Sequence, residues 1–130
     1  MMEIIVDKFN EIIYKACVRY GNEEGVDGNK MQVLFSLDDE GEVKYSLLKE
    51  YRPYKDVTFN QILNVKIDFK GYSMIVPPFI KNTINKYSES LSTSPQNLFV
   101  MCVVKRENEI GLFLYNEKKP VEEILLTELL

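Results

Sequence analysis

The chain has 130 residues, 45% hydrophobic side chains and a formal net charge of −4, which is typical of one globular domain over residues 1–130. It contains no His, and this excludes Ser–His and Cys–His catalysis together with the usual His-containing zinc sites. The acidic balance, 20 Asp and Glu against 16 Lys and Arg, disfavours nucleic-acid binding, which requires a basic surface.

The N-terminus and the two cysteines indicate a cytoplasmic protein. The first residues include acids where a secretory signal carries bases. The longest apolar stretch, residues 74–80, is far shorter than the about 20 residues that span a bilayer. Cys17 and Cys102 stand in apolar stretches, which predicts two buried and reduced thiols, with a disulfide between them as the alternative. We expect no membrane association, no metal and no cofactor.

The first predicted element is an amphipathic helix over residues 2–20, ended by Gly21 in a left-handed conformation. The glycine-containing stretch 21–30 is interpreted as a connector, because its spacing matches neither a Walker loop nor a dinucleotide fingerprint. The apolar side chains that recur with helical spacing are Ile5, Phe9, Ile12, Ile13, Ala16 and Tyr20.

A hairpin is predicted next, over residues 31–47, because apolar and polar residues alternate on both sides of a turn at residues 38–41. Residues 49–56 are expected to be irregular because Pro53 interrupts the pattern. Thr58 and Gln61 have the spacing of a capping box, which predicts one short helical turn over residues 58–63.

The middle of the chain predicts a second hairpin and a second helix. A turn at residues 70–71 would pair the two arms of segment 65–76, with one long bent strand as the alternative. Pro77 and Pro78 are expected to start the helix, because proline is tolerated in a first turn. Its predicted buried stripe is Ile80, Ile84, Tyr87 and Leu91.

The last third predicts a central strand over residues 98–104, covered on both faces, and a return strand over 110–115. Residues 121–129 fit a short C-terminal helix, with a final edge strand as the alternative. We find no internal repeat. The expected fold is α+β: an antiparallel sheet of about five to six strands built from hairpins, with an N-terminal, a middle and a short C-terminal helix packed on it.

Two clusters could carry chemistry, and both have structural interpretations. Asp38, Asp39 and Glu40 could hold a hard cation, but three acids on a hairpin turn are also typical of a solvated tip. Cys17 lacks a cation on its own helical face that would stabilise a thiolate. We therefore assign no catalytic, cofactor-binding or metal-binding residue.

The most suggestive segment for binding is 49–55. Its candidate contact residues are Tyr51, Arg52, Tyr54 and Lys55, since tyrosine and arginine dominate binding hot spots. A tyrosine-rich loop can also lie over the edge of a core with its hydroxyl groups in water.

The C-terminus carries more leucine than a chain end needs. We interpret Ile124, Leu125 and Leu129 as interface residues of a homodimer, or else as a cover for the sheet of their own subunit. The predicted order of elements resembles that of the small acidic dimeric chaperones of type III secretion, which run helix, three strands, helix, two strands, helix. This resemblance implies a protein-binding role.

The sequence therefore favours a non-catalytic protein-binding module of the chaperone, adaptor or inhibitor kind that forms a homodimer and binds another protein. A small-molecule binder that sequesters a nucleotide-like ligand is the first alternative. An enzyme that uses carboxylates or lysine without His is the second, although no pair of acids has a spacing that places both in one pocket.

Overall fold

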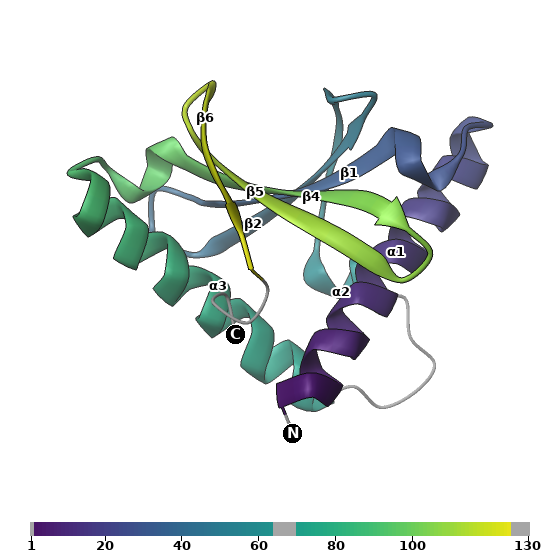
Figure 1. The fold of residues 1–130 in the computed structure, drawn as a ribbon, viewed down its shortest axis with the longest axis horizontal. Helices are drawn as coiled ribbons and strands as arrows, with labels where there is room; N and C mark the ends of the chain where they lie inside the picture. Colours follow the sequence, from purple (N-terminus) through teal and green to yellow (C-terminus); the bar gives the residue numbers. More distant parts are fainter. Residues whose placement is uncertain (1, 64–69, 126–130) are drawn as a thin grey trace.

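The fold is a six-stranded antiparallel sheet with two long helices on one face (Figure 1). A computed structural model describes residues 2–63 and 70–125. The strand order is β3-β2-β1-β4-β5-β6, which confirms the predicted α+β class. The strands are β1 (Met31–Leu37), β2 (Val43–Lys49), β3 (Arg52–Val57), β4 (Leu98–Arg106), β5 (Glu109–Asn116) and β6 (Lys119–Ile124). The helices are α1 (Met2–Glu24), α2 (Phe59–Leu63) and α3 (Lys70–Leu91), with 3-10 turns η1 (Gly28–Lys30) and η2 (Pro95–Asn97).

Aromatic contacts join the elements of the core between the sheet and the helices. The ring centroid of Phe35 on β1 lies 6.1 Å from that of Phe9 on α1 and 5.7 Å from that of Tyr45 on β2. Tyr45 contacts Phe59 of α2 at 5.3 Å. Aromatic pairs, here two edge-to-face and one tilted, stabilise a core beyond the area they bury, so this row of rings ties α1, the sheet and α2 together.

Helix α1 runs one turn further than predicted, to Glu24. Gly25 takes the left-handed conformation with φ 70°. The N–H of Val26 donates to the carbonyl of Gly21 at 2.9 Å, and the N–H of Gly25 donates to that of Asn22 at 3.3 Å. This is a Schellman motif. Gly21, predicted to end the helix, lies inside it. The position favours glycine because a Cβ there would lie 2.7 Å from the carbonyl oxygen of Val26.

The prediction that segment 49–56 is irregular is wrong. Lys49 is the last residue of β2, and residues 52–56 belong to β3. Pro53 is accommodated because β3 is an edge strand, where a missing N–H need not interrupt the ladder. The predicted capping box is confirmed. The N–H of Gln61 donates to Oγ1 of Thr58 at 3.1 Å, and the N–H of Thr58 donates to Oε1 of Gln61 at 2.8 Å.

The predicted second hairpin is wrong over residues 70–76, which form the start of α3, while 64–69 lie outside the described residues. Pro77 and Pro78 lie inside this helix and not at its start. Val76, Ile80 and Ile84 are fully buried at four-residue spacing. Burial of this stripe outweighs the hydrogen bonds that the prolines remove.

The predicted C-terminal helix is wrong over residues 121–124, which belong to strand β6, so the alternative of a final edge strand is confirmed there. Residues 126–130 lie outside the described part. Pairing with β5 favours a strand over a helix here, because Ile124 then lies opposite Leu112 and is buried against the core. Five of the six residues of β6 are exposed, as fits an edge strand.

The structure also corrects the expectation that the chain has no repeat. Both halves run helix, 3-10 turn and three antiparallel strands, so that α1-η1-β1-β2-β3 corresponds to α3-η2-β4-β5-β6. An offset of 67 residues relates the two halves, as it relates Pro53 to Pro120. Leu34 lies opposite Met101 in the β1–β4 pair, and the same offset relates these two. A pseudo-two-fold axis therefore passes through this pair, perpendicular to the sheet.

Among the described residues, no helix combines the length and the apolar character needed to cross a bilayer.

Candidate binding groove on the uncovered face of the sheet

The two faces of the sheet have different neighbours. Val33 and Phe35 on β1 are buried beneath the helices, whereas Leu34 between them points to the opposite face. Segment 98–104 is a central strand, as predicted, but α1 and α3 cover only one of its faces (Figure 1). Within residues 2–63 and 70–125, no helix lies over the other face, so its apolar side chains form a surface.

This uncovered face contains a groove of about 660 Å³, which is within the range of protein sites that bury a ligand. Its floor includes Leu48 and Met101, which are 8% and 7% exposed. The lining residues are Leu34, Leu48, Tyr51, Pro53, Gln96, Asn97, Phe99, Met101, Tyr115, Glu117 and Lys118. The pseudo-two-fold pair Leu34 and Met101 is therefore part of the floor.

Two turns form the sides of the groove. The β2–β3 turn contributes Tyr51, and Pro53 follows it on β3; the β5–β6 turn contributes Glu117 and Lys118. Both turns rise from the sheet on the side away from α1 and α3 (Figure 1). The groove is therefore concave, with an apolar floor between a rim of Tyr51 and Pro53 and a charged rim of Glu117 and Lys118.

Equivalent hydrogen bonds hold the two turns. The N–H of Glu50 donates to the carbonyl of Lys30 at 2.7 Å, and the N–H of Glu117 donates to that of Asn97 at 2.7 Å. Glu50, Tyr51 and Glu117 have φ of 49°, 65° and 56°, a backbone conformation that residues other than glycine adopt rarely. Asn108 in the β4–β5 turn has a similar φ of 55°, as two-residue hairpin turns require, so the conformation itself is a property of the tight turns.

Gln32 of β1 lies beneath the β2–β3 turn and is 0% exposed. Its Oε1 accepts a hydrogen bond of 2.8 Å from the N–H of Tyr51. Its Nε2 has no hydrogen-bond partner among the described residues. Gln32 lines a second cavity of about 310 Å³, together with Asn29, Lys30, Glu50 and Tyr51. Tyr51 thus lines both the groove and the smaller cavity.

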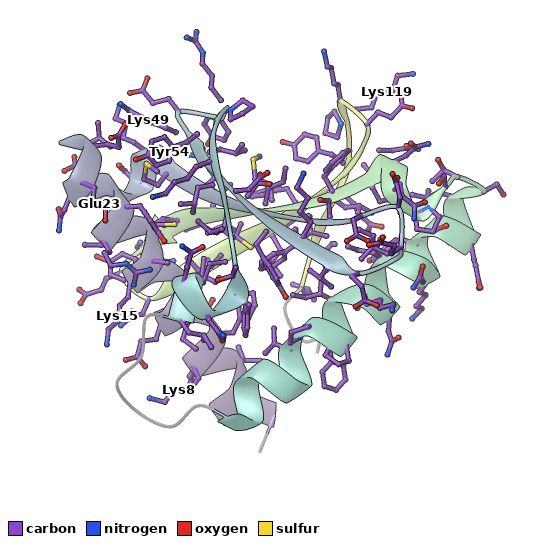
Figure 2. The ribbon with its side chains drawn as sticks, turned by 180° about the vertical axis from the view of Figure 1, so that it is seen from behind. Lys8, Lys15, Glu23, Lys49, Tyr54 and Lys119 are labelled. Carbon is purple, nitrogen blue, oxygen red and sulfur yellow. The ribbon has the colours of Figure 1, made fainter. Side chains whose placement is uncertain are left out.

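The structure divides the four candidate contact residues of segment 49–55. Tyr51 lines the groove, and Arg52 is exposed beside it. Tyr54 and Lys55 instead approach α1, because the Nζ of Lys55 lies 4.7 Å from the ring centroid of Tyr20. Figure 2 shows Tyr54 near Lys49 and Glu23, at the α1 end of the molecule, with Lys119 on the other turn.

The proposed interface residues are also separated. Ile124 is 3% exposed and packs in the core of its own chain. Leu125 is 63% exposed. Leu129 lies outside the described residues. Ile124 is therefore placed to cover the sheet of its own subunit, and Leu125 is available to a second molecule.

The two clusters examined for chemistry have local structural roles. Oδ1 of Asp38 accepts hydrogen bonds of 2.9 Å from the N–H groups of Glu40 and Glu42, which shapes the β1–β2 turn. Burial raises the pKa of Cys17 to about 12, so this thiol is protonated at neutral pH. Cys102 is also buried, and neither cysteine forms a disulfide.

The groove residues other than Tyr51 were not identified from the sequence. Met101 stands in a strand that is apolar on both faces, and that pattern predicts burial instead of a surface. Leu34 and Leu48 alternate with polar residues on their face of the sheet, so each looks like a single apolar residue on an otherwise polar face. The identity of Glu50 and Glu117 is a trace of the site in the sequence, but their equivalence is recognisable only once the structure places both in corresponding turns.

No family model, curated protein or solved structure matches the chain.

Proposed function

We propose that the protein is a non-catalytic protein-binding module, and that the groove on the uncovered sheet face holds an apolar peptide segment of a partner protein. The observation that carries the proposal is the concave apolar floor around Leu34 and Met101 in a sheet whose other face is already filled by helices. Contiguous apolar surface rimmed by polar residues is typical of interaction sites.

The shape of the groove favours a narrow occupant. A raised turn bounds each side, so two copies of this face brought together would meet at their rims and leave the floor unfilled. A single helix or extended segment can pass between the rims and place its side chains on the floor.

The edges of the sheet favour binding on the face over strand addition. Pro53 stands on edge strand β3 and Pro120 on edge strand β6. β6 also carries Lys119, Glu122 and Glu123. Prolines and charges on edge strands prevent pairing with another chain, so both edges are protected.

Selection of short random peptides displayed on phage, with the full chain as the target, tests this function. We expect selected peptides to contain several large apolar residues, and to lose binding to Phe99→Glu, which places a charge in the groove. Phe79→Glu is the matched control, because Phe79 is 37% exposed on α3. Failure to select any peptide, or equal loss of binding in both variants, contradicts the proposal.

A small-molecule binder is the second candidate. The volume of about 660 Å³ and the apolar floor suit a small apolar ligand. The separation of Tyr54 and Lys55 from the groove weakens the specific expectation of a nucleotide-like ligand. A thermal-shift screen against small apolar molecules tests this second candidate, because a ligand that binds the native state raises its melting temperature. No shift with any of these molecules would count against it.

The homodimer expected from the sequence stays a prediction. Leu125, 63% exposed, is the more exposed of two apolar side chains near the described C-terminal end, with Val121 at 38%. Light scattering of wild type and Leu125→Glu tests it, with a strict monomer for wild type at high micromolar concentration counting against the dimer.

A further inference from the structure

The smaller cavity beside Gln32 is the counterpart of one end of the groove. Each of its five lining residues has a counterpart 67 positions later in the second half. These counterparts all line the groove: Gln96, Asn97, Phe99, Glu117 and Lys118. The two cavities therefore occupy equivalent places on the two halves of the uncovered face. Since Tyr51 lines both, it separates the smaller cavity from the groove.

The chemistry of the two equivalent places differs at one buried position. Where the second half has the half-buried ring of Phe99, the first half has the fully buried amide of Gln32. The second half folds without a polar group here, so the architecture does not require one. A buried amide nitrogen without an acceptor destabilises the native state, yet Nε2 of Gln32 has no partner among the described residues.

We propose that this cavity is a polar subsite of the groove, in which Nε2 of Gln32 donates a hydrogen bond to an amide carbonyl oxygen of the bound segment. The inference rests on the proposed peptide-binding function. Tyr51 is 60% exposed at the tip of its turn, so its side chain can move aside and join the two cavities without disturbing the core.

The charges around the cavity favour a neutral acceptor. Lys30 and Glu50 line it with opposite charges, so no net charge is available to hold an anion. A carboxylate would lose its hydration and face the carboxylate of Glu50, whereas an amide carbonyl loses far less on burial. The occupant of the subsite is therefore a main-chain carbonyl, or the side-chain carbonyl of an Asn or Gln in the partner segment.

The test uses the tightest peptide from the display selection with the wild-type chain and Gln32→Met. Methionine keeps the approximate shape of glutamine and removes both the Nε2 donor and the Oε1 acceptor. We expect Gln32→Met to weaken peptide binding about tenfold. Its urea midpoint should stay close to that of the wild type, because removal of the unpaired Nε2 donor offsets loss of the Oε1 acceptor for the N–H of Tyr51. In wild type, saturation with peptide should shift the side-chain amide resonances of Gln32 and leave those of exposed Gln61 unmoved.

Two results would overturn the subsite. One is equal affinity of wild type and Gln32→Met for the peptide, with the Gln32 amide resonances unmoved. The other is a loss of affinity matched by a lower urea midpoint, which indicates a structural role. In either case, loss of binding in Phe99→Glu with retention in Phe79→Glu leaves the peptide-binding function standing. Absence of any peptide that binds the wild type contradicts the function itself.

Discussion

The main-chain N–H of Tyr51 donates a hydrogen bond of 2.8 Å to Oε1 of Gln32, and so joins an exposed turn to a fully buried strand residue. Tyr51 adopts φ 65° to do so. Its counterpart in the second half is Lys118, and that of Gln32 is Phe99. The two halves of the molecule share a backbone plan and differ in chemistry at this place, where the groove meets the smaller cavity.

Replacement of Tyr51 by Gly should stabilise the fold and weaken binding. Glycine adopts positive φ without steric conflict, so we expect the free energy of unfolding to rise by about 1 kcal/mol. The same change removes an aromatic side chain from the groove, so affinity for a display-selected peptide should fall. Urea unfolding and fluorescence anisotropy measure the two effects on one preparation.

Ser92→Gly is the matched control for Tyr51→Gly. Ser92 has φ 51° at the end of α3, and the N–H of Thr93 donates to the carbonyl of Ser88 at 3.1 Å. This substitution should raise stability by a similar amount, about 1 kcal/mol, and leave peptide affinity unchanged. An equal loss of affinity in both variants would show that Tyr51 has no special part in binding.

Gly21 should tolerate serine better than alanine. An added Cβ would lie 2.7 Å from the carbonyl oxygen of Val26, so we expect Gly21→Ala to lower stability by about 1–3 kcal/mol. At the equivalent position of the second half, the Ser88 hydroxyl donates to the carbonyl of Thr93 at 2.6 Å. A serine hydroxyl at residue 21 can make the same bond, which should recover about 1 kcal/mol in urea unfolding. Serine no better than alanine would mean that the two helix ends are not equivalent.

Phe35→Ala should be among the most damaging single substitutions. The side chain is 0% exposed and contacts the rings of Phe9 and Tyr45, so the expected loss is about 3–5 kcal/mol. Phe113→Ala is the control, because Phe113 is only partly buried on β5 and should lose less. Chemical denaturation compares them, and similar losses would contradict the assignment of the core to the helix side of the sheet.

Stability should fall in alkali through Cys17. Burial raises its pKa from 9.0 to about 12, so the folded chain holds this proton over a window in which the unfolded chain releases it. The free energy of unfolding is then unaffected by Cys17 below about pH 9 and decreases above it, by about 1.4 kcal/mol per pH unit.

Cys17→Ala removes this titration while Cys102 remains in both chains. The wild-type chain should therefore lose its advantage over Cys17→Ala as pH rises through the window. Urea unfolding at a series of pH values gives the two profiles, and parallel profiles would exclude a contribution from Cys17.

Elements that depend on neighbours within one segment were predictable from the sequence. The stripe of α1 and the capping box of Thr58 and Gln61 are examples. Segment 70–76 was not, since its apolar residues fit both a strand and a buried helix over so short a stretch. Strand β6 was mistaken for a helix because its conformation depends on pairing with β5, which local sequence does not reveal.

The groove and the repeat were harder to predict because both depend on how distant segments come together. The halves share identical residues at a few positions, such as Tyr20 with Tyr87 and Pro53 with Pro120, which is too little to reveal a repeat by eye. The floor of the groove exists because helices cover one face of β1 and β4 and not the other. The alternation in β1 indicates its covered face, but β4 is apolar on both faces, so its sequence does not state which face remains open.

The most direct test of the central claim is a map of peptide contacts by NMR, from backbone amide shifts of the full chain titrated with a display-selected peptide. The account predicts shifts on β1, β4 and the two turns around Leu34, Met101, Tyr51 and Lys118, with α1 and the outer side of α3 unchanged. Shifts confined to the helices, or to the edges β3 and β6, would contradict it.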